Sequence, residues 1–300
     1  MNNLFGEEVI KSTYKFFDNN YLSIINTNKF DWQNRKRMYL KLGIKSELGR
    51  NEVSFFERYK TLGYDNLKNK SGKNNGGLMD NPGNRGASVF DPVLCELIYS
   101  MHLDKSKNQI LDPFAGGSVR GIIAHYLGFN YTGIELRQEQ VDSNREQSLS
   151  ILDIANQPQW YVGDSNKLLD NNWNKQFDLL FTCPPYFNLE VYSDLENDLS
   201  NMDYVSFLAC YESIIKKSCN LLKSGAYACI VIQEIRDKNE NLIGLVPDTI
   251  NAFKKAGMNY YNEMILQKVI ASKALLSRRF FEKSKKITRH HENVLIFRKP

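Results

Sequence analysis

The sequence Asp-Pro-Phe-Ala-Gly-Gly-Ser occupies residues 112–118, between two segments of different hydrophobic periodicity. The apolar run Gln109–Leu111 before it predicts a short strand. Ser118–Leu127 after it carries apolar residues at helical spacing, which predicts a helix with one buried face. Because the glycine pair lacks Cβ atoms, the backbone there can approach a ligand closely. Residues 109–127 therefore predict a strand–turn–helix unit whose turn is a candidate binding site.

Predicted strands and helices alternate over the following residues. The further strands are Tyr131–Ile134, Trp160–Val162, Phe177–Phe181, Tyr227–Ile232, Tyr260–Val269 and Asn293–Arg298. The predicted helices are Pro92–Leu103 with Asp91 as its N-cap, Gln138–Ile154, Tyr204–Leu222 and Pro247–Ala256. This alternation is typical of an α/β fold with a doubly wound parallel sheet and right-handed crossovers.

The organisation of the chain changes near residue 86. Before it, Trp32–Leu42 and Glu52–Leu62 predict short helices in a polar, basic segment. Lys70–Gly86 contains five Gly and four Asn, which predicts a linker. Residues 87–300 hold the alternating elements and predict the main domain. We expect residues 1–86 to pack on that domain or on its ligand.

The charge of the chain is unevenly distributed. The formal net charge is +5, with +6 on residues 1–87 and −1 on the remainder. Within that remainder, Lys268–His291 has eight basic residues against one Glu. Two basic regions beside a nearly neutral core suit a polyanionic partner such as nucleic acid. A basic surface that is only solvated is the alternative interpretation.

Other features of the sequence exclude several protein classes. No apolar run approaches the length of a membrane span, and Met1–Glu8 has neither the basic nor the apolar region of a signal peptide. The five cysteines include no C-x-x-C pair, and the four histidines show no zinc-ligand spacing. We therefore expect a cytoplasmic protein with free thiols and no metal site.

Two carboxylates follow the glycine turn at strand ends. Glu135 ends the second predicted strand about twenty residues after the glycines, where a carboxylate can chelate ribose hydroxyls. Asp164 follows the third strand, where it can accept a hydrogen bond from an adenine amino group. Neither a G-x-x-x-x-G-K-[ST] nor a G-x-G-x-x-G pattern is present, so the site predicted is for a nucleoside cofactor rather than a triphosphate. The alternative is that each carboxylate only caps the next helix.

A second turn, Cys183-Pro184-Pro185-Tyr186, follows the fourth predicted strand. Its prolines fix the backbone and remove two N–H donors, which leaves the carbonyls free to accept hydrogen bonds. An exocyclic amine becomes a methyl acceptor when its N–H groups are held and its lone pair faces an electrophilic methyl group. An aromatic residue beside the prolines can stack on a base extracted from its duplex. A rigid loop with a core tyrosine is the alternative.

The two turns, in this order, resemble motifs of the S-adenosylmethionine-dependent amino-methyltransferases of DNA, whose catalytic motif is Asp/Asn/Ser-Pro-Pro-Tyr/Phe/Trp. The resemblance is closest to phage-encoded DNA modification methylases and extends from about Ala87 to the end of the sequence. The segments that carry it are Phe90–Leu97, Asp112–Gly121, Cys183–Ser193 and His291–Phe297, with a weaker match near Leu42–Arg50. It implies a Rossmann-like sheet of seven strands, mostly parallel with the last antiparallel. It also implies S-adenosylmethionine as the cofactor and double-stranded DNA as the partner.

The resemblance also implies roles for individual residues. Those placed around the cofactor are Phe90, Asp112, Phe114, Gly116, Glu135 and Asp164. Those placed at the target amine are Cys183, Pro184, Pro185 and Tyr186, with Tyr186 and Phe187 stacking on the flipped base. From their charge, the first phosphate-contact candidates are Arg278, Arg279, Lys283, Lys285, Lys286 and Arg289, and the second are Arg35, Lys36 and Arg37. The loop Asn188–Asn201 either closes over the base or is a plain surface loop.

Cys183 departs from the family pattern, which has Asp, Asn or Ser at that position. A thiol is a weak acceptor, so the Pro184 carbonyl is expected to contribute more. Cysteine is close in shape to serine, which typifies the cytosine-N4 enzymes and favours cytosine over adenine. The alternatives are pyrimidine C5 methylation with Cys183 as nucleophile, an RNA or protein methyltransferase with the same cofactor, and a catalytically decayed binding module.

Overall fold

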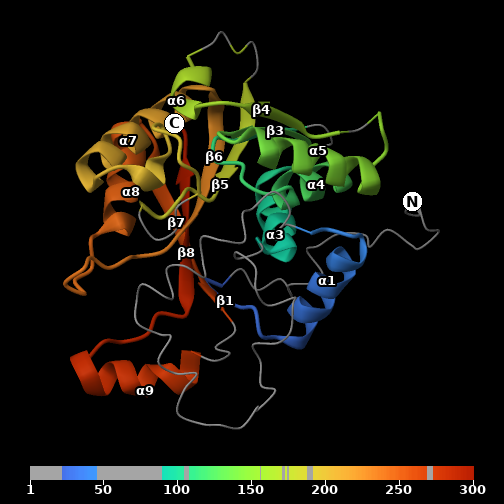
Figure 1. The fold of residues 1–300 in the computed structure, drawn as a ribbon. Helices are drawn as coiled ribbons and strands as arrows, with labels where there is room; N and C mark the ends of the chain where they lie inside the picture. The colour runs from blue at the N-terminus through green and yellow to red at the C-terminus, as the bar shows by residue number, and fades with distance from the viewer. Residues whose placement is uncertain are drawn as a thin grey trace.

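The computed structural model describes residues 22–45, 90–104, 108–155, 157–170, 173, 176–187, 192–268 and 273–300. One eight-stranded sheet with the order β1-β7-β8-β6-β5-β2-β3-β4 forms its centre (Figure 1). The predicted helix Glu52–Leu62 and the predicted linker Lys70–Gly86 lie outside the described residues.

The strands confirm the predicted α/β fold. They are β1 (Ile24–Asn26), β2 (Gln109–Asp112), β3 (Asn130–Glu135), β4 (Gln159–Val162), β5 (Phe177–Thr182), β6 (Leu222–Ile232), β7 (Asn259–Gln267) and β8 (His291–Arg298). The seven predicted strands are β2 to β8, and the last of them, β8, is antiparallel to both of its neighbours, β6 and β7. The other neighbouring pairs are parallel. The additional strand, β1, pairs with β7 and was not predicted, because three residues with an exposed Ile24 give no periodic signal.

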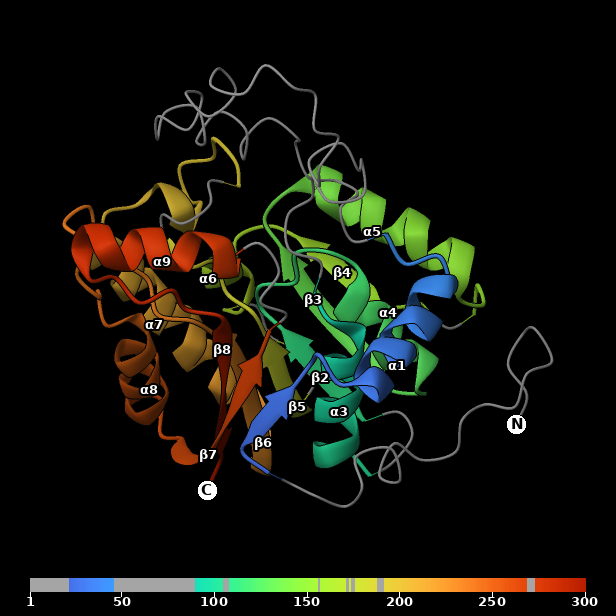
Figure 2. The same ribbon diagram turned by 90° about the horizontal axis from the view of Figure 1, so that it is seen from below.

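Helices cover both faces of the sheet (Figures 1 and 2). One face is packed by α1 (Phe30–Lys41), α3 (Pro92–His102), α4 (Val119–Tyr126) and α5 (Gln138–Ile151). The other is packed by α6 (Ser165–Leu168), α7 (Tyr204–Asn220) and α8 (Leu245–Lys255). The remaining helix, α9 (Lys273–Ser284), lies between β7 and β8 in the sequence. It was not predicted as a helix; only the positive charge of this region was noted.

The two cores explain why the central strands are apolar almost throughout. Successive side chains of a strand point to opposite faces, so Leu179 joins the core under α3 and α4 while Leu180 joins the core under α7. Cys229 and Ile230 on β6 divide in the same way. A parallel strand that is covered on both faces has no solvent-exposed side, so its residues form a continuous apolar run. Such runs are the pattern from which these strands were predicted.

The described part of the N-terminal segment is attached to the main sheet. The helix α1 matches the predicted Trp32–Leu42 and packs on α3, where the buried Arg35 side chain forms an ion pair with Glu96. Trp32 Nε1 donates to Asp91 Oδ2 at 3.1 Å. Asp91 is also the predicted cap of α3, because its Oδ1 accepts from the Val93 N–H at 3.0 Å. Through β1, the same segment adds an outer strand beside β7.

The strand order places a ligand crevice between β2 and β5. The chain runs outward from β2 through β3 to β4, then returns to the other side of β2 with β5. In open α/β sheets, ligands bind beyond the carboxyl ends of the strands at such a reversal. Because β8 is antiparallel, its first residues lie at this same edge of the sheet.

Candidate active site

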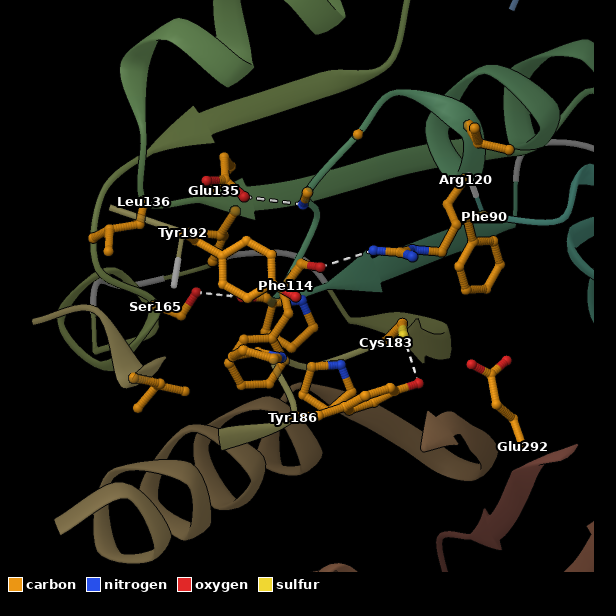
Figure 3. Close-up of a pocket in the computed structure, with 18 of the residues that line it drawn as sticks. Phe90, Phe114, Arg120, Glu135, Leu136, Ser165, Cys183, Tyr186, Tyr192 and Glu292 are labelled. Carbon is orange, nitrogen blue, oxygen red and sulfur yellow. Dashed lines mark hydrogen bonds between the residues drawn. The ribbon is translucent and has the colours of Figure 1, made fainter. Parts of the chain in front are cut away.

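A cavity of about 670 Å³ opens at the carboxyl edge of the sheet. Gly116, Gly117 and residues 183–186 all line it. Figure 3 shows Cys183 and Tyr186 in this cavity together with Glu135. The two turns identified from the sequence therefore share one cavity, of a size ordinary for small-molecule sites.

Asp112 is the buried centre of a polar network under the glycine turn. Its Oδ2 accepts hydrogen bonds from Arg120 Nε at 2.6 Å and from the Tyr131 hydroxyl at 2.7 Å. Its Oδ1 accepts from the Thr182 hydroxyl at 2.5 Å and from the Phe114 N–H at 3.2 Å. The side chain is fully buried and does not line the cavity. The expectation that Asp112 surrounds the cofactor is therefore corrected: it ties the turn after β2 to the end of β5.

Arg120 is a cavity residue that the sequence reasoning missed. Its Nη2 donates to the carbonyls of Phe114 and Ala115, both at 2.8 Å, and its guanidinium lies 4.6 Å from the centroid of the Phe90 ring. Burial lowers the pKa of Arg120, but the attraction of Asp112 outweighs this, so the pKa is raised and the charge is kept. The signal in the sequence was a single arginine on the otherwise apolar face of the helix after the glycine turn.

The glycine turn is also held from the β3 side. Glu135 Oε2 accepts from the Gly116 N–H at 3.0 Å, and Oε1 accepts from the Arg137 N–H at 3.1 Å. Gly116 has a φ of +51°, in the left-handed region that glycine adopts without strain. Asn144 Nδ2 donates to the Gly116 carbonyl at 2.7 Å. The Glu135 side chain thus organises the turn and lines the cavity at once.

Asp164 lies at the end of the cavity beyond β4. Its Oδ1 caps α6 by accepting from the Asn166 N–H at 2.8 Å, which is the alternative role considered for it. The same residue also lines the cavity, beside Ser165. Phe114, Ile134 and Leu136 supply apolar surface at this end.

The proline turn presents Tyr186 to the cavity. The Tyr186 hydroxyl lies 3.4 Å from Cys183 Sγ and donates to the Val231 carbonyl at 3.5 Å, which fixes the ring against the end of β6 (Figure 3). Burial raises the pKa of Tyr186 well above its ordinary value, so the phenol stays protonated.

Phe187 does not have the role expected for it. It is 8% exposed, has a φ of +51°, and packs edge-on against Tyr204 and Phe207. It does not line the cavity. The predicted stacking on a base is therefore corrected: Phe187 anchors the proline turn in the core under α7.

The Cys183 thiol lines the cavity in its neutral form. Burial raises the pKa of Cys183 to about 11, and the nearby Arg120 charge only partly opposes this. Since the thiolate is the nucleophilic form of cysteine, this environment is the opposite of the one that activates a catalytic cysteine.

We expect alkylation of Cys183 by iodoacetamide to be slow at neutral pH. Because the pKa is raised to about 11, its rate should keep rising with pH and show no plateau before that value. Peptide mass spectrometry would follow the modified residue, with Cys183→Ser identifying its signal. A plateau below the ordinary thiol pKa of about 8.5 would contradict this and indicate an activated nucleophile.

The candidate phosphate contacts differ in the exposure of their side chains. Arg35 is buried against Glu96, so its predicted contact with nucleic acid is corrected. Lys36 lines the cavity and donates to Asp91 Oδ2 at 3.1 Å, while Arg37 is exposed. Among the C-terminal candidates, those with exposed side chains are Arg278, Arg279, Lys283 and Lys285, and those partly buried are Lys286 and Arg289. Arg278 pairs with Glu282 and Lys286 with Glu240, both at the surface.

Other segments contribute cavity residues that the motifs did not indicate. They are Thr27 and Gln33 from the N-terminal segment, Tyr192, Asn197, Asp198 and Leu199 from the loop after the proline turn, and Gln233, Leu266, Lys268 and Glu292 from the ends of β6, β7 and β8. Of the predicted loop Asn188–Asn201, residues 188–191 lie outside the described residues.

In the part of the chain that the structure describes, no group of three or more His, Cys, Asp or Glu is placed to hold a metal ion. No helix in those same ranges is long and apolar enough to cross a bilayer.

Residues 177–300 match a family model described as DNA methylase. Among solved structures, the chain is similar to TrmN from Thermus thermophilus, with 13% identity, a TM-score of 0.45, and coverage of 70% of this chain and 49% of that one. It is also similar to a TehB-like SAM-dependent methyltransferase from Corynebacterium glutamicum, with 15% identity, a TM-score of 0.44, and coverage of 72% and 90%. The chain thus spans about half the length of TrmN. No curated protein sequence matches it.

Proposed function

We propose that this protein transfers a methyl group from S-adenosylmethionine to the exocyclic amino group of a base in double-stranded DNA. The observation that carries the proposal is the shared cavity: the glycine turn after β2 and the turn Cys183-Pro184-Pro185-Tyr186 after β5 both line it. The match of residues 177–300 to the DNA methylase family supports the choice of reaction and substrate.

The end of the cavity near β3 and β4 fits an adenosine group. The Glu135 carboxylate lies beside the Cβ-free backbone of Gly116, where ribose hydroxyls can donate to it. In this proposal Asp164 accepts from an adenine amino group; it lines the cavity, as do the apolar side chains Ile134 and Leu136. S-adenosylmethionine bound there would supply an electrophilic methyl group on a sulfonium.

The end near β5 fits a flipped base. In this proposal the Pro184 carbonyl accepts one N–H of the target amino group, and the Tyr186 ring, which lines the cavity, stacks on the base. Flipping costs a few kcal/mol, which stacking and phosphate contacts from α9 would offset. The contribution of the chain is then positioning and electrostatics rather than covalent chemistry.

Within this reaction class we propose cytosine N4 as the target, because Cys183 has the shape of the serine found in cytosine-N4 enzymes. Pyrimidine C5 methylation is disfavoured, since it requires a thiolate and burial raises the pKa of Cys183 to about 11.

The test is incubation with labelled S-adenosylmethionine and either unmethylated duplex DNA of mixed sequence or RNA, followed by digestion and mass spectrometry of the nucleosides. We expect N4-methylcytosine from DNA. N6-methyladenine would keep the reaction and change the base, while C5-methylcytosine or label in RNA alone would overturn the proposal. A reaction containing excess S-adenosylhomocysteine is the control.

A further inference from the structure

A carboxylate from the last strand faces the proline turn. Glu292 is the second residue of β8, and its register partner on β7 is Leu266. Because β8 is antiparallel, Glu292 lies at the edge where β5 and β6 end, and it lines the same cavity as Cys183 and Tyr186. Figure 3 shows its carboxylate directed toward the side of the cavity where these two residues lie.

The surroundings of Glu292 leave part of its hydrogen-bonding capacity unused. Only 8% of the residue is exposed, and its Oε1 pairs with Lys268, which follows β7. Within the described residues Lys268 is its one hydrogen-bonding partner, so Oε2 is available to a ligand. The negative charge of Glu292 adds to burial in raising the pKa of both Cys183 and Tyr186, in keeping with its place in the same cavity.

The other cavity carboxylates nearby are already committed. Asp91 accepts from Trp32, Lys36 and Val93. Asp198 accepts from Ser193 and Ser200.

An amino group presented to the proline turn needs two acceptors. It has two N–H bonds, and its lone pair is directed only when both are held. The Pro184 carbonyl can accept one of them. The side chain at the first position of the turn is the usual second acceptor, but Cys183 offers a weakly accepting sulfur that is also engaged by the Tyr186 hydroxyl.

We propose that the Glu292 carboxylate accepts the second N–H of the target amino group, with Lys268 fixing its orientation. Glu292 thereby supplies from β8 the acceptor that Cys183 does not supply from the turn after β5. The inference rests on the proposed function, and it adds a substrate-contacting residue to it.

The test measures single-turnover methylation of duplex DNA with saturating S-adenosylmethionine. Glu292→Ala should lower the rate constant roughly 10- to 100-fold, as expected for loss of a hydrogen bond to a charged group. Glu292→Gln keeps an acceptor oxygen and should fall between Glu292→Ala and the wild type. Affinity for S-adenosylhomocysteine should not change, whereas loss of the pair with Lys268 is expected to lower the thermal midpoint whatever the role of Glu292, so the rate constant is the readout. Glu263→Gln is the matched control, because Glu263 is an exposed carboxylate on β7 that accepts from Asn293 outside the cavity.

A second background separates substrate contact from bracing of the sheet. Cys183→Asn restores a side-chain acceptor in the turn without adding charge, so Glu292→Ala should cost less than about threefold there. If Glu292 only braces β7 against β8, its loss would lower the rate by the same factor in both backgrounds, which would overturn the inference. Wild-type rates for Glu292→Ala would overturn it as well. A wild-type protein that binds S-adenosylhomocysteine but methylates no DNA would instead show that the proposed function itself has failed.

Discussion

Asp112→Ala is expected to lower the free energy of unfolding by about 3–5 kcal/mol, the range for removing one partner of a buried ion pair. The carboxylate is fully buried and accepts from Arg120, Tyr131 and Thr182, so its removal leaves a buried guanidinium and two hydroxyls without their acceptor. Denaturant unfolding followed by circular dichroism measures the change.

The matched control is Asp142→Ala, which removes an exposed carboxylate 3.6 Å from Arg145 on α5. Exposed pairs contribute at most about 1 kcal/mol, so this variant should unfold close to the wild type. Asp112→Asn keeps one acceptor oxygen, replaces the other with an NH2 donor and loses the charge, so it should lie between the two. Equal unfolding midpoints for Asp112→Ala and the wild type would contradict a central role for this network.

Tyr186→Ala is expected to lower the rate of DNA methylation roughly 100-fold, near the upper end of what one aromatic–base stack contributes. The ring lines the cavity beside the proline turn, while the proposed cofactor contacts lie at the other end. Affinity for S-adenosylhomocysteine, measured by calorimetry, should therefore change little.

Tyr186→Phe is the informative companion, because it keeps the ring and loses only the hydroxyl contacts to Cys183 and Val231. It should retain most of the activity. Tyr161→Ala, at a half-exposed tyrosine on β4 outside the cavity, should have no effect. Full activity of Tyr186→Ala would show that the base stacks elsewhere.

The fold could be predicted where the signal is local. The central strands are buried on both faces, and a run such as Phe177–Phe181 records that burial in its own residues. The three residues of β1 show no such apolar run. They form a strand because they pair with β7, about 240 positions further along the chain. The helix α9 was not predicted, because only the charge of its residues was interpreted, although apolar residues are as numerous in it as charged ones.

The candidate site could likewise be predicted only in part. Both turns follow strands directly, so their common edge could be inferred from the sequence alone. Whether Asp112 and Phe187 face the cavity or the core depends on packing from other elements, and for these two the expectation was corrected. Arg120 and Glu292 reach the cavity from a helix and from an antiparallel strand; both lie in segments that carry the resemblance, but no role could be assigned to either from the sequence.

The position of β8 has a consequence for how the molecule assembles. The last strand of the sequence is interior in the sheet, and β7 and β1 connect to the other strands only through it. During synthesis, β1 emerges long before β7, with which it pairs, and these two strands join the rest of the sheet only when β8 is available. Such long-range closure makes folding slow, and the edge of β6 that pairs with β8 stays unpaired until β8 has been synthesised.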